Sequence, residues 1–349
     1  MANKMTGTNI VIADASSSAS QKVAIVEEPR KIKLIDAQIP TPSPEEIRVR
    51  IKYVGICGSD LEVYRGHRQA EFISFPSGLG HEVAGVIDMV GSNVIGLAVG
   101  DRVTCRYVWG AYGEYIVCNP FNVKVVPPRL TMKQTSLLEV LPGILHAAEL
   151  ANVSEKSSVL IMGQGVSGLL LTQVFSLFSP RHLVCTDLND KNLHLARKYG
   201  ATHTVKIPSK TTPTREALGS QFPDGFDIVV PALLEGDGLV DAIDIASFCG
   251  RIILYGCIGL CSATVDLFKV HKKRLEIYST EPRRDIDMRR LFNESLNLVL
   301  DGLINTSEII DLIMPLSKIS EAFELRNDET NDIIHVLIDC DQENTYDAQ

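Results

Sequence analysis

The sequence predicts an α/β protein with two domains, one built from short, mostly antiparallel strands and one built around a parallel sheet. The chain has 349 residues, which exceeds the size at which a single hydrophobic core usually stops growing. Short β-runs broken by Gly and Pro fill residues 22–128, whereas strand-like and helix-like runs alternate from residue 158 onwards. The first pattern is typical of a barrel-like domain, and the second of a sheet made from βαβ units.

Five runs in the first part alternate apolar with polar positions and are rich in β-branched residues, as half-buried strands are. They are KVAIVEE, EIRVRIKYVGI, HEVAGVIDMVG, GEYIVCN and FNVKVVPP. Residues 1–21 are polar and lack the apolar block of a signal peptide, which predicts a flexible N-terminal tail.

The second part contains four short apolar runs, SVLIMG, HLVCTD, FDIVVP and RIILYG. Segments with helical periodicity, such as VSGLLLTQVFSLF and DKNLHLARKYG, separate them. We expect a doubly wound parallel sheet here. Beyond residue 285 the sequence predicts a helix to about Leu300, a second helical run in SKISEAFELR and a last strand in IIHVLID, followed by a loose polar tail.

Composition narrows the possible partners. The net charge is −9 and the pI is about 5.4, which argues against a nucleic-acid-binding surface. No apolar run reaches membrane-spanning length. The eight cysteines are scattered and form no CxxC pair, so reduced thiols are favoured over disulfides or a structural Cys₄ zinc site. We therefore expect a cytoplasmic protein that acts on a small molecule.

The segment GQGVSG matches the pattern GxGxxG between an apolar strand and an apolar-periodic helix. In this context the pattern predicts a Rossmann dinucleotide site. Gly163 allows a tight turn, Gly165 lets the pyrophosphate approach the backbone, and Gly168 lets the helix pack on the strand. Val166 and Ser167 open the helix, whose N-terminus faces the phosphates.

Asp187 lies at the end of the next predicted strand, where an acid would accept the adenosine ribose hydroxyls. No Arg follows closely in TDLNDKN, so the sequence favours NAD over NADP. The alternative is that Asp187 caps the helix that begins near Asp190.

His81 and Glu82 stand side by side in GLGHEVAGVI. The pair is not half of a metalloprotease helix, because Gly85 occupies the position of the second His. An isolated pair of this kind also fits an ordinary surface turn. Cys57 and Glu139 are the other candidate ligands, and sulfur, imidazole and carboxylate are donors that zinc accepts.

The ordered motifs ICGSD, GLGHEVAGVI, GDRV, GAYGEYIV, LLEV and GxGxxG resemble those of medium-chain, zinc-dependent alcohol dehydrogenases, most closely the sorbitol or polyol branch. The resemblance runs from about Lys22 to Asp339. It implies a GroES-like catalytic domain at residues 22–150 and 302–349, interrupted by a Rossmann NAD-binding domain at residues 151–301. It also implies one catalytic zinc and a homodimer or homotetramer.

Within this resemblance, Cys57 and His81 match the two fixed zinc ligands. Glu82 matches a carboxylate that binds zinc directly in polyol dehydrogenases and exchanges with water in related enzymes. Glu139 matches either a further ligand or a residue beside the zinc-bound water.

The resemblance assigns two further roles near the metal. Ser59 matches a hydroxyl that hydrogen-bonds the substrate oxygen and begins a proton relay. Asp60 is expected to orient His81, since metal-bound imidazoles usually have such a partner.

The chain departs from this family at three places. The segment after GDRV contains only Cys105, so the four cysteines that hold a structural zinc in many relatives are missing. Several relatives have a proton-relay His five residues after the zinc Cys, where this chain has Glu62. The alternative interpretation of Glu62 is a solvated side chain without a role in the relay. The usual Glu-Pro at the fourth zinc position is Glu139-Val140.

The implied reaction is hydride transfer between NAD(H) and a secondary alcohol or ketone of the polyol, cyclitol or sugar-derived class, with Ser59, Glu82 and Glu139 in the catalytic group. The alternatives are a zinc-free reductase of an activated double bond and a non-catalytic nucleotide-binding protein. Basic residues in YRGHRQ and in EPRRD, including Arg283 and Arg284, could meet an anionic substrate, although a solvated loop is the simpler interpretation of YRGHRQ.

Overall fold

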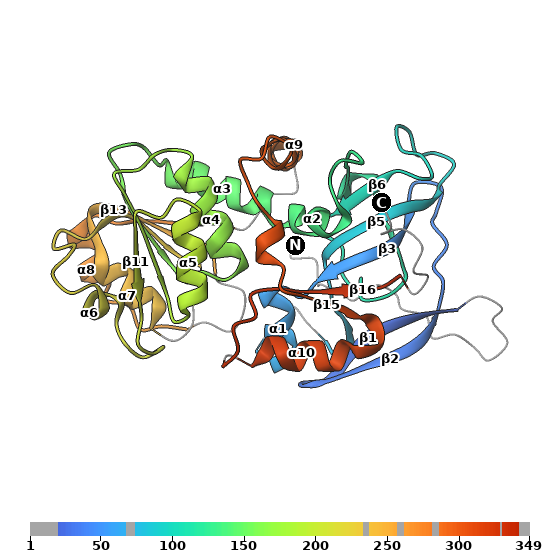
Figure 1. Ribbon diagram of the computed structural model, residues 1–349, viewed down its shortest axis with the longest axis horizontal. Coiled ribbons are helices and arrows are strands. Elements are labelled where there is room, and N and C mark those ends of the chain that lie inside the picture. The colour runs from blue at the N-terminus through green and yellow to red at the C-terminus, as the bar shows by residue number, and fades with distance from the viewer. Residues whose placement is uncertain are drawn as a thin grey trace. The chain divides into compact units, whose positions relative to one another are not determined.

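The computed structural model describes residues 20–67, 74–232, 237–256, 262–280, 286–328 and 330–341. Contacts within the chain define two compact units, unit 1 (Met1–Glu139 and Thr306–Gln349) and unit 2 (Val140–Asn305). Both are drawn in Figure 1. The sequence placed residues up to 150 in the first domain. In the structure, helix α3 (Leu141–Ala151) instead packs against helices of unit 2.

Unit 1 consists mainly of strands. Its strands are β1 (Ser20–Glu28), β2 (Lys31–Gln38), β3 (Ile47–Gly55), β4 (Ser77–Gly78), β5 (Glu82–Val90), β6 (Arg102–Cys105), β7 (Tyr115–Cys118), β8 (Val123–Val125), β15 (Leu312–Pro315) and β16 (Val336–Asp339). Its helices are α1 (Gly58–Arg65), α2 (Met132–Ser136) and α10 (Ile319–Asn327), with short 3₁₀ turns that include η2 (Leu137–Glu139).

The strands of unit 1 form two sheets around one apolar core. The larger sheet has the order β15-β16-β3-β5-β6-β8, with β7 paired to β3, and the smaller has the order β2-β1-β4. Strand β3 alternates buried and half-buried residues over most of its length, as expected of a strand with one face on the core. Pairing of β16 with β3 brings the C-terminal part of the chain into this sheet.

Unit 2 alternates strands with helices. Its strands are β9 (Ser158–Met162), β10 (His182–Asp187), β11 (His203–Lys206), β12 (Phe226–Pro231), β13 (Ala246–Leu254) and β14 (Glu276–Ser279). Besides α3, its helices are α4 (Val166–Ser176), α5 (Asp190–Lys198), α6 (Thr214–Leu218), α7 (Gly238–Ile245), α8 (Leu267–Lys273) and α9 (Ile286–Leu300).

The sheet of unit 2 is parallel throughout its described strands, with the order β11-β10-β9-β12-β13-β14. The order reverses direction next to β9, as in doubly wound nucleotide-binding sheets, where the ligand binds beyond the carboxyl end of the strands. In Figure 1, α4 and α5 lie on one side of this sheet and α7 and α8 on the other. Strand β9 is almost entirely buried, because helices cover both faces of such a sheet.

The predicted α/β fold class is confirmed by this combination of sheets. The final strand is shorter than the predicted run, because it begins at Val336. Helix α1 was not predicted, since its eight residues carry little apolar periodicity. Residues 1–19 and 342–349 of the expected tails lie outside the described residues, but Ser20 and Gln21, which the sequence also assigned to the N-terminal tail, begin strand β1.

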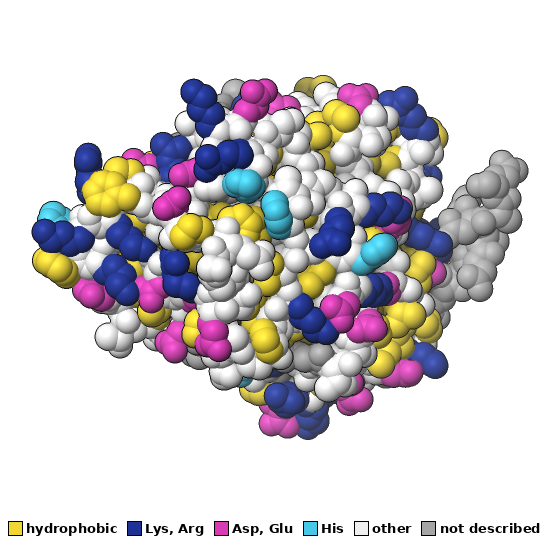
Figure 2. All heavy atoms as spheres, turned by 60° about the vertical axis from the view of Figure 1, so that its left-hand side comes forward, with side chains coloured by type: hydrophobic (Ala, Val, Ile, Leu, Met, Phe, Trp, Pro, Cys, Tyr) yellow, Lys and Arg dark blue, Asp and Glu magenta, His cyan; other side chains and the backbone are white. Residues whose placement is uncertain are grey.

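The helices and the surface charges can be compared with those of membrane-spanning and nucleic-acid-binding proteins. None of the helices in the described part of the chain combines the length and apolar character that a membrane span requires. On the face drawn in Figure 2, Lys and Arg side chains are interspersed with Asp and Glu. That mixture differs from the clustered basic surface that is typical of nucleic-acid-binding proteins.

Candidate functional site

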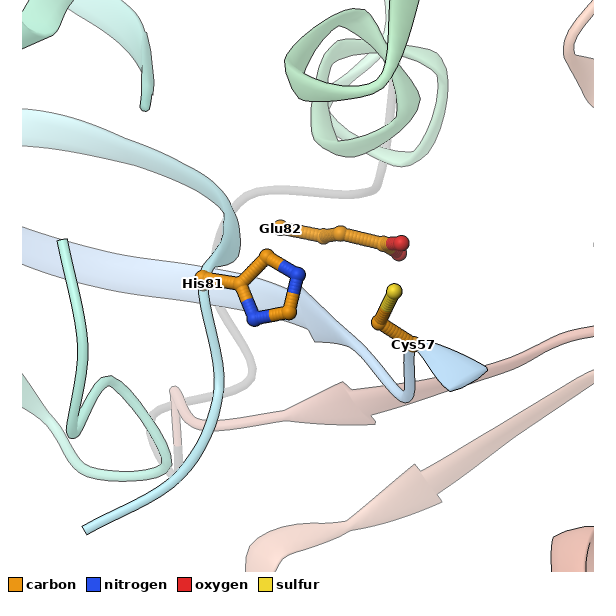
Figure 3. A group of neighbouring side chains, drawn as sticks. All are labelled: Cys57, His81 and Glu82. Atoms are coloured by element: carbon orange, nitrogen blue, oxygen red, sulfur yellow. The ribbon is translucent and has the colours of Figure 1, made fainter. Parts of the chain in front are cut away.

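Three side chains of unit 1, those of Cys57, His81 and Glu82, converge on one point. Each offers one ligand atom, and these atoms all lie within 4.8 Å of one another. Figure 3 shows the Cys57 sulfur, the His81 ring and the Glu82 carboxylate turned towards each other. Thiolate sulfur, imidazole nitrogen and carboxylate oxygen are all zinc ligands, and three protein ligands with one open position are typical of catalytic zinc. The donor set therefore fits a zinc ion.

Pairing of β3 with β5 explains why these residues meet. The two strands are antiparallel, and Gly55 at the end of β3 lies opposite Glu82 at the start of β5. Cys57 follows two residues after Gly55, as the N-cap residue of α1. His81 immediately precedes β5, so one end of a strand pair supplies all three side chains.

Asp60 fixes the surroundings of His81 and Cys57. Its Oδ2 accepts hydrogen bonds from the Cys57 backbone N–H (3.1 Å) and the Tyr112 hydroxyl (2.9 Å). Its Oδ1 accepts one from the Gly80 backbone N–H (3.1 Å) and lies 3.5 Å from His81 Nδ1. A carboxylate beside Nδ1 would leave Nε2 as the nitrogen for a metal, as the role predicted for Asp60 requires.

Ser59 and Glu62 lie on α1, the helix that follows Cys57. The Ser59 hydroxyl is 3.5 Å from His81 Nε2, on the side of the ring that faces the ligand group. Glu62 is buried, and its carboxylate pairs with Arg65 at 3.0 Å. The suggestion that Glu62 is solvated is therefore wrong. Arg65 also donates a hydrogen bond to Asn327.

Glu139 is not a member of the group of three. Its Oε1 lies 3.1 Å from Nη1 of Arg106, which also donates to the Glu139 backbone carbonyl. Burial raises the pKa of the Glu139 carboxyl, although the positive charge of Arg106 opposes this. We did not single out Arg106 from the sequence. Its position in the apolar segment TCRYVWG was a usable signal, because a buried Arg nearly always has an acidic partner.

The ligand residues perturb one another electrostatically. Burial raises the pKa of the Cys57 thiol. Burial alone would raise the pKa of Glu82, but the neighbouring His335 outweighs it, so that this pKa lies below its ordinary value. Burial alone would lower the pKa of His81, but Asp60 and Cys57 raise it well above its ordinary value. Strongly perturbed groups gathered at one place are typical of functional sites.

Two aromatic neighbours of the ligand residues, Trp109 and His335, were not predicted from the sequence. The indole of Trp109, the only tryptophan of the chain, has its ring centroid 4.4 Å from that of His81. His335 lies 3.1 Å from Glu82, with both side chains buried. No local pattern marks either residue, because only the folded strands bring it to the site.

The cofactor candidates Gly163 to Gly168 span the turn after β9 and the start of α4. Gly163 has φ = 90°, a conformation that glycine adopts without strain. A Cβ at Gly165 would meet nothing within 4 Å, whereas a Cβ at Gly168 would lie 2.0 Å from the Gly163 carbonyl oxygen. The second glycine thus leaves open space, and the third permits close packing of helix on strand. Val166 and Ser167 are the first residues of α4.

Asp187 ends β10 and is hydrogen-bonded to this turn. Its Oδ2 accepts from the Gln164 backbone N–H (2.6 Å) and its Oδ1 from that of Asn189 (2.8 Å). Burial raises its pKa, and these hydrogen bonds oppose the shift. The N-cap of α5 is Asn189, whose side chain accepts from the Lys191 backbone N–H. The alternative that Asp187 caps this helix is therefore wrong.

Three of the basic candidates, Arg68 of the YRGHRQ run together with Arg283 and Arg284, lie outside the described residues.

Comparisons with known proteins agree with the geometry. Residues 43–133 match the alcohol dehydrogenase GroES-like domain. L-threonine 3-dehydrogenase of Coxiella burnetii is 30% identical over 318 residues, which are 82% of this chain and 90% of the relative. Sorbitol dehydrogenase of Bacillus subtilis is 25% identical over 91% of this chain and 97% of its own length.

Solved structures show the same fold. The alcohol dehydrogenase rspB of Escherichia coli CFT073, solved with NADH, superposes with a TM-score of 0.80 at 25% identity. The match covers 92% of this chain and all of that structure. These findings confirm the predicted enzyme class, an NAD-dependent zinc alcohol dehydrogenase, and the GroES-like and Rossmann fold class. The chain belongs to the medium-chain, zinc-dependent alcohol dehydrogenase family, in its polyol-dehydrogenase-like branch.

Proposed function

We propose that this chain interconverts a secondary alcohol and its ketone at a zinc ion held by Cys57, His81 and Glu82. One observation carries the proposal: three different zinc donors lie within 4.8 Å of one another at the end of a strand pair. When bound, zinc polarises the substrate oxygen and NAD accepts the hydride. Three donors from the protein leave a coordination position for the substrate.

The residues around the ligands position this chemistry. Asp60 keeps His81 in the orientation that presents Nε2. The Ser59 hydroxyl, on the same side of the ring, is placed to hold the proton of the substrate alcohol and to pass it outwards. Farther along the same helix, the buried Glu62 pairs with the partly buried Arg65.

Glu139 has a different role from Glu82 in this proposal. Arg106 holds the Glu139 carboxylate by one oxygen and also bonds its backbone. Glu139 therefore stays beside the metal position as a charged neighbour and is not one of its direct ligands. Of the two possibilities that the sequence left open for Glu139, the contact with Arg106 supports a residue beside the zinc-bound water.

We propose that unit 2 binds NAD through Gly163, Gly165 and Gly168, with Val166 and Ser167 at the helix N-terminus beneath the pyrophosphate. Asp187 would accept hydrogen bonds from the ribose hydroxyls. Its hydrogen bond with the Gln164 backbone N–H holds it beside the glycine turn, which supports this role. A 2′-phosphate would meet the same carboxylate, so NAD is favoured over NADP.

We propose a polyol, cyclitol or sugar-derived alcohol as the substrate. The supporting observations are the relatives named sorbitol dehydrogenase and L-threonine 3-dehydrogenase, since both names denote the oxidation of a hydroxyl-bearing carbon next to a polar group.

We also propose that the protein is a cytoplasmic homodimer or homotetramer and has no nucleic-acid or membrane partner. We propose that unit 1 is the catalytic domain and unit 2 the NAD-binding domain, with boundaries near residues 139 and 305 in place of the predicted 150 and 301.

A substrate panel tests the proposed function. Polyols, cyclitols, amino alcohols and phosphorylated sugars would each be incubated with NAD, and NADH formation followed by absorbance. We expect turnover with at least one secondary alcohol and its loss after zinc removal. Metal-independent reduction of an activated double bond would favour the zinc-free reductase, and cofactor binding without any turnover would favour a non-catalytic nucleotide-binding protein.

A further inference from the structure

A buried histidine lies behind one of the proposed zinc ligands. His335 Nε2 is 3.1 Å from Oε2 of Glu82, and the side chains are 0% and 1% exposed. Within the described residues, Oε2 of Glu82 and both ring nitrogens of His335 have no hydrogen-bond partner with full hydrogen-bond geometry. Two polar groups buried against each other in this way are costly unless they satisfy one another.

Three adjacent strands fix the contact. Gly55 of β3 lies opposite Glu82 of β5 on one side and opposite Leu337 of β16 on the other. His335 precedes Leu337 by two residues, so its side chain shares a face with that of Leu337. The His335 carbonyl oxygen accepts hydrogen bonds from the backbone N–H groups of Asp311 (3.0 Å) and Leu312 (3.3 Å), which hold this segment in place.

The absence of a side chain at Gly55 makes room for the pair. A Cβ at Gly55 would lie 2.0 Å from Glu82 Oε2 and 2.6 Å from His335 Nε2. Real Cβ atoms do not approach other atoms so closely, so any larger residue at position 55 would displace the carboxylate or the imidazole. Position 55 thus serves the contact between Glu82 and His335 as well as the strand.

We propose that His335 is a positioning residue that engages Oε2 of Glu82, so that the carboxylate offers a single oxygen to the metal. This inference rests on the proposed function. A carboxylate that used both oxygens would fill the coordination position that the substrate requires. Ligating carboxylates commonly accept hydrogen bonds of this kind, and the groups that supply them tune metal affinity.

The test uses the full-length protein loaded with zinc or with cobalt(II). His335→Leu removes the donor at similar volume, whereas His335→Gln keeps an N–H donor. The Leu variant should bind zinc about 10- to 100-fold more weakly in a competition assay with a chromophoric chelator. It should also change the cobalt absorption spectrum, while the Gln variant restores most of both properties.

Two further variants separate positioning from stability. Val336→Ala truncates the buried residue next to His335 and should lower the melting temperature without changing zinc affinity or the cobalt spectrum. Gly55→Ala should reproduce the metal phenotype of His335→Leu. If the Leu variant does not fold, the contrast between the Gln and Gly55→Ala variants decides.

The outcomes distinguish this inference from the proposed function. Wild-type zinc affinity and an unchanged cobalt spectrum in His335→Leu, or in Gly55→Ala if the Leu variant is unfolded, would overturn the role of His335 alone. A wild-type protein that binds no zinc would overturn both the inference and the proposed metal site.

Discussion

The metal group of unit 1 and the glycine turn of unit 2 are built by opposite means. In unit 1, three side chains from two separated segments each contribute one atom, and strand pairing brings them together. In unit 2, a continuous stretch of backbone between β9 and α4 forms the site, and what matters at Gly165 and Gly168 is a missing side chain. One site depends on which groups are present, and the other on which are absent.

This difference has a consequence for mutations. A ligand side chain can be replaced by a residue of similar size with little effect on folding, because its role is chemical. A glycine whose Cβ position is occupied by backbone cannot be replaced without moving that backbone. The following substitutions test this contrast, starting with the largest expected effect.

Cys57→Ser should abolish turnover while leaving NAD binding by unit 2 intact. Loss of the metal removes several kcal/mol of charge stabilisation, and about 4 kcal/mol corresponds to about a thousandfold in rate. Metal content, NADH formation and NADH binding would be measured on the same preparation. A variant that keeps its zinc and most of its activity would show that Cys57 is not a ligand.

Glu82→Gln and Glu139→Gln form a matched pair of buried carboxylates in the same unit. Glu82→Gln should weaken zinc binding strongly, since it alters a proposed ligand. Glu139→Gln should keep a zinc stoichiometry near one, because Arg106 rather than the metal holds this carboxylate. Zinc affinities of both variants provide the check, and equal losses would place Glu139 among the ligands.

Gly168→Ala and Gly165→Ala form the corresponding pair in unit 2. Gly168→Ala puts a Cβ 2.0 Å from a backbone oxygen and should cost about 1–3 kcal/mol of stability. Gly165→Ala meets no atom and should change stability by less than about 0.5 kcal/mol, yet it should weaken NAD binding by crowding the pyrophosphate.

Thermal unfolding and NADH titration distinguish the two glycine variants. If Gly165→Ala bound NADH as tightly as the wild type, the proposed approach of the pyrophosphate to this backbone would be wrong.

Asp187→Ser should narrow the preference for NAD over NADP. Loss of a charge-assisted hydrogen bond costs about 1.5–3 kcal/mol, which corresponds to about a tenfold to hundredfold change. The measurement is kcat/KM with both cofactors for the wild type and the variant. Equal efficiencies in the wild type, or an undiminished preference in the variant, would show that Asp187 does not set the choice.

The two sites also differ in how far the sequence predicted them. Strand, glycine turn and helix follow one another along the chain, so GQGVSG and Asp187 could be assigned from local pattern alone. The pair of His81 and Glu82 was ambiguous by itself, and only its resemblance to a family, together with Cys57, favoured a metal site. Contacts between side chains that lie far apart in the sequence could not be predicted from either kind of pattern.

Arg106, Trp109 and His335 illustrate what local sequence does not contain. Each meets a site residue only after β5, β6, β16 and the 3₁₀ turn η2 have assembled. Glu62 shows the same limit in another way, since its neighbours on α1 gave no sign that it would be buried beside Arg65. The family pattern predicted the candidate ligands, whereas the packing around them required the fold.

X-ray absorption at the zinc edge tests the central claim most directly. The account predicts one zinc per chain with one sulfur neighbour at about 2.3 Å and nitrogen or oxygen neighbours at about 2.0–2.2 Å. Cys57→Ser should remove the sulfur contribution. A zinc surrounded by several sulfur atoms, or one without any sulfur neighbour in the wild type, would contradict the assignment of Cys57, His81 and Glu82 as the ligands.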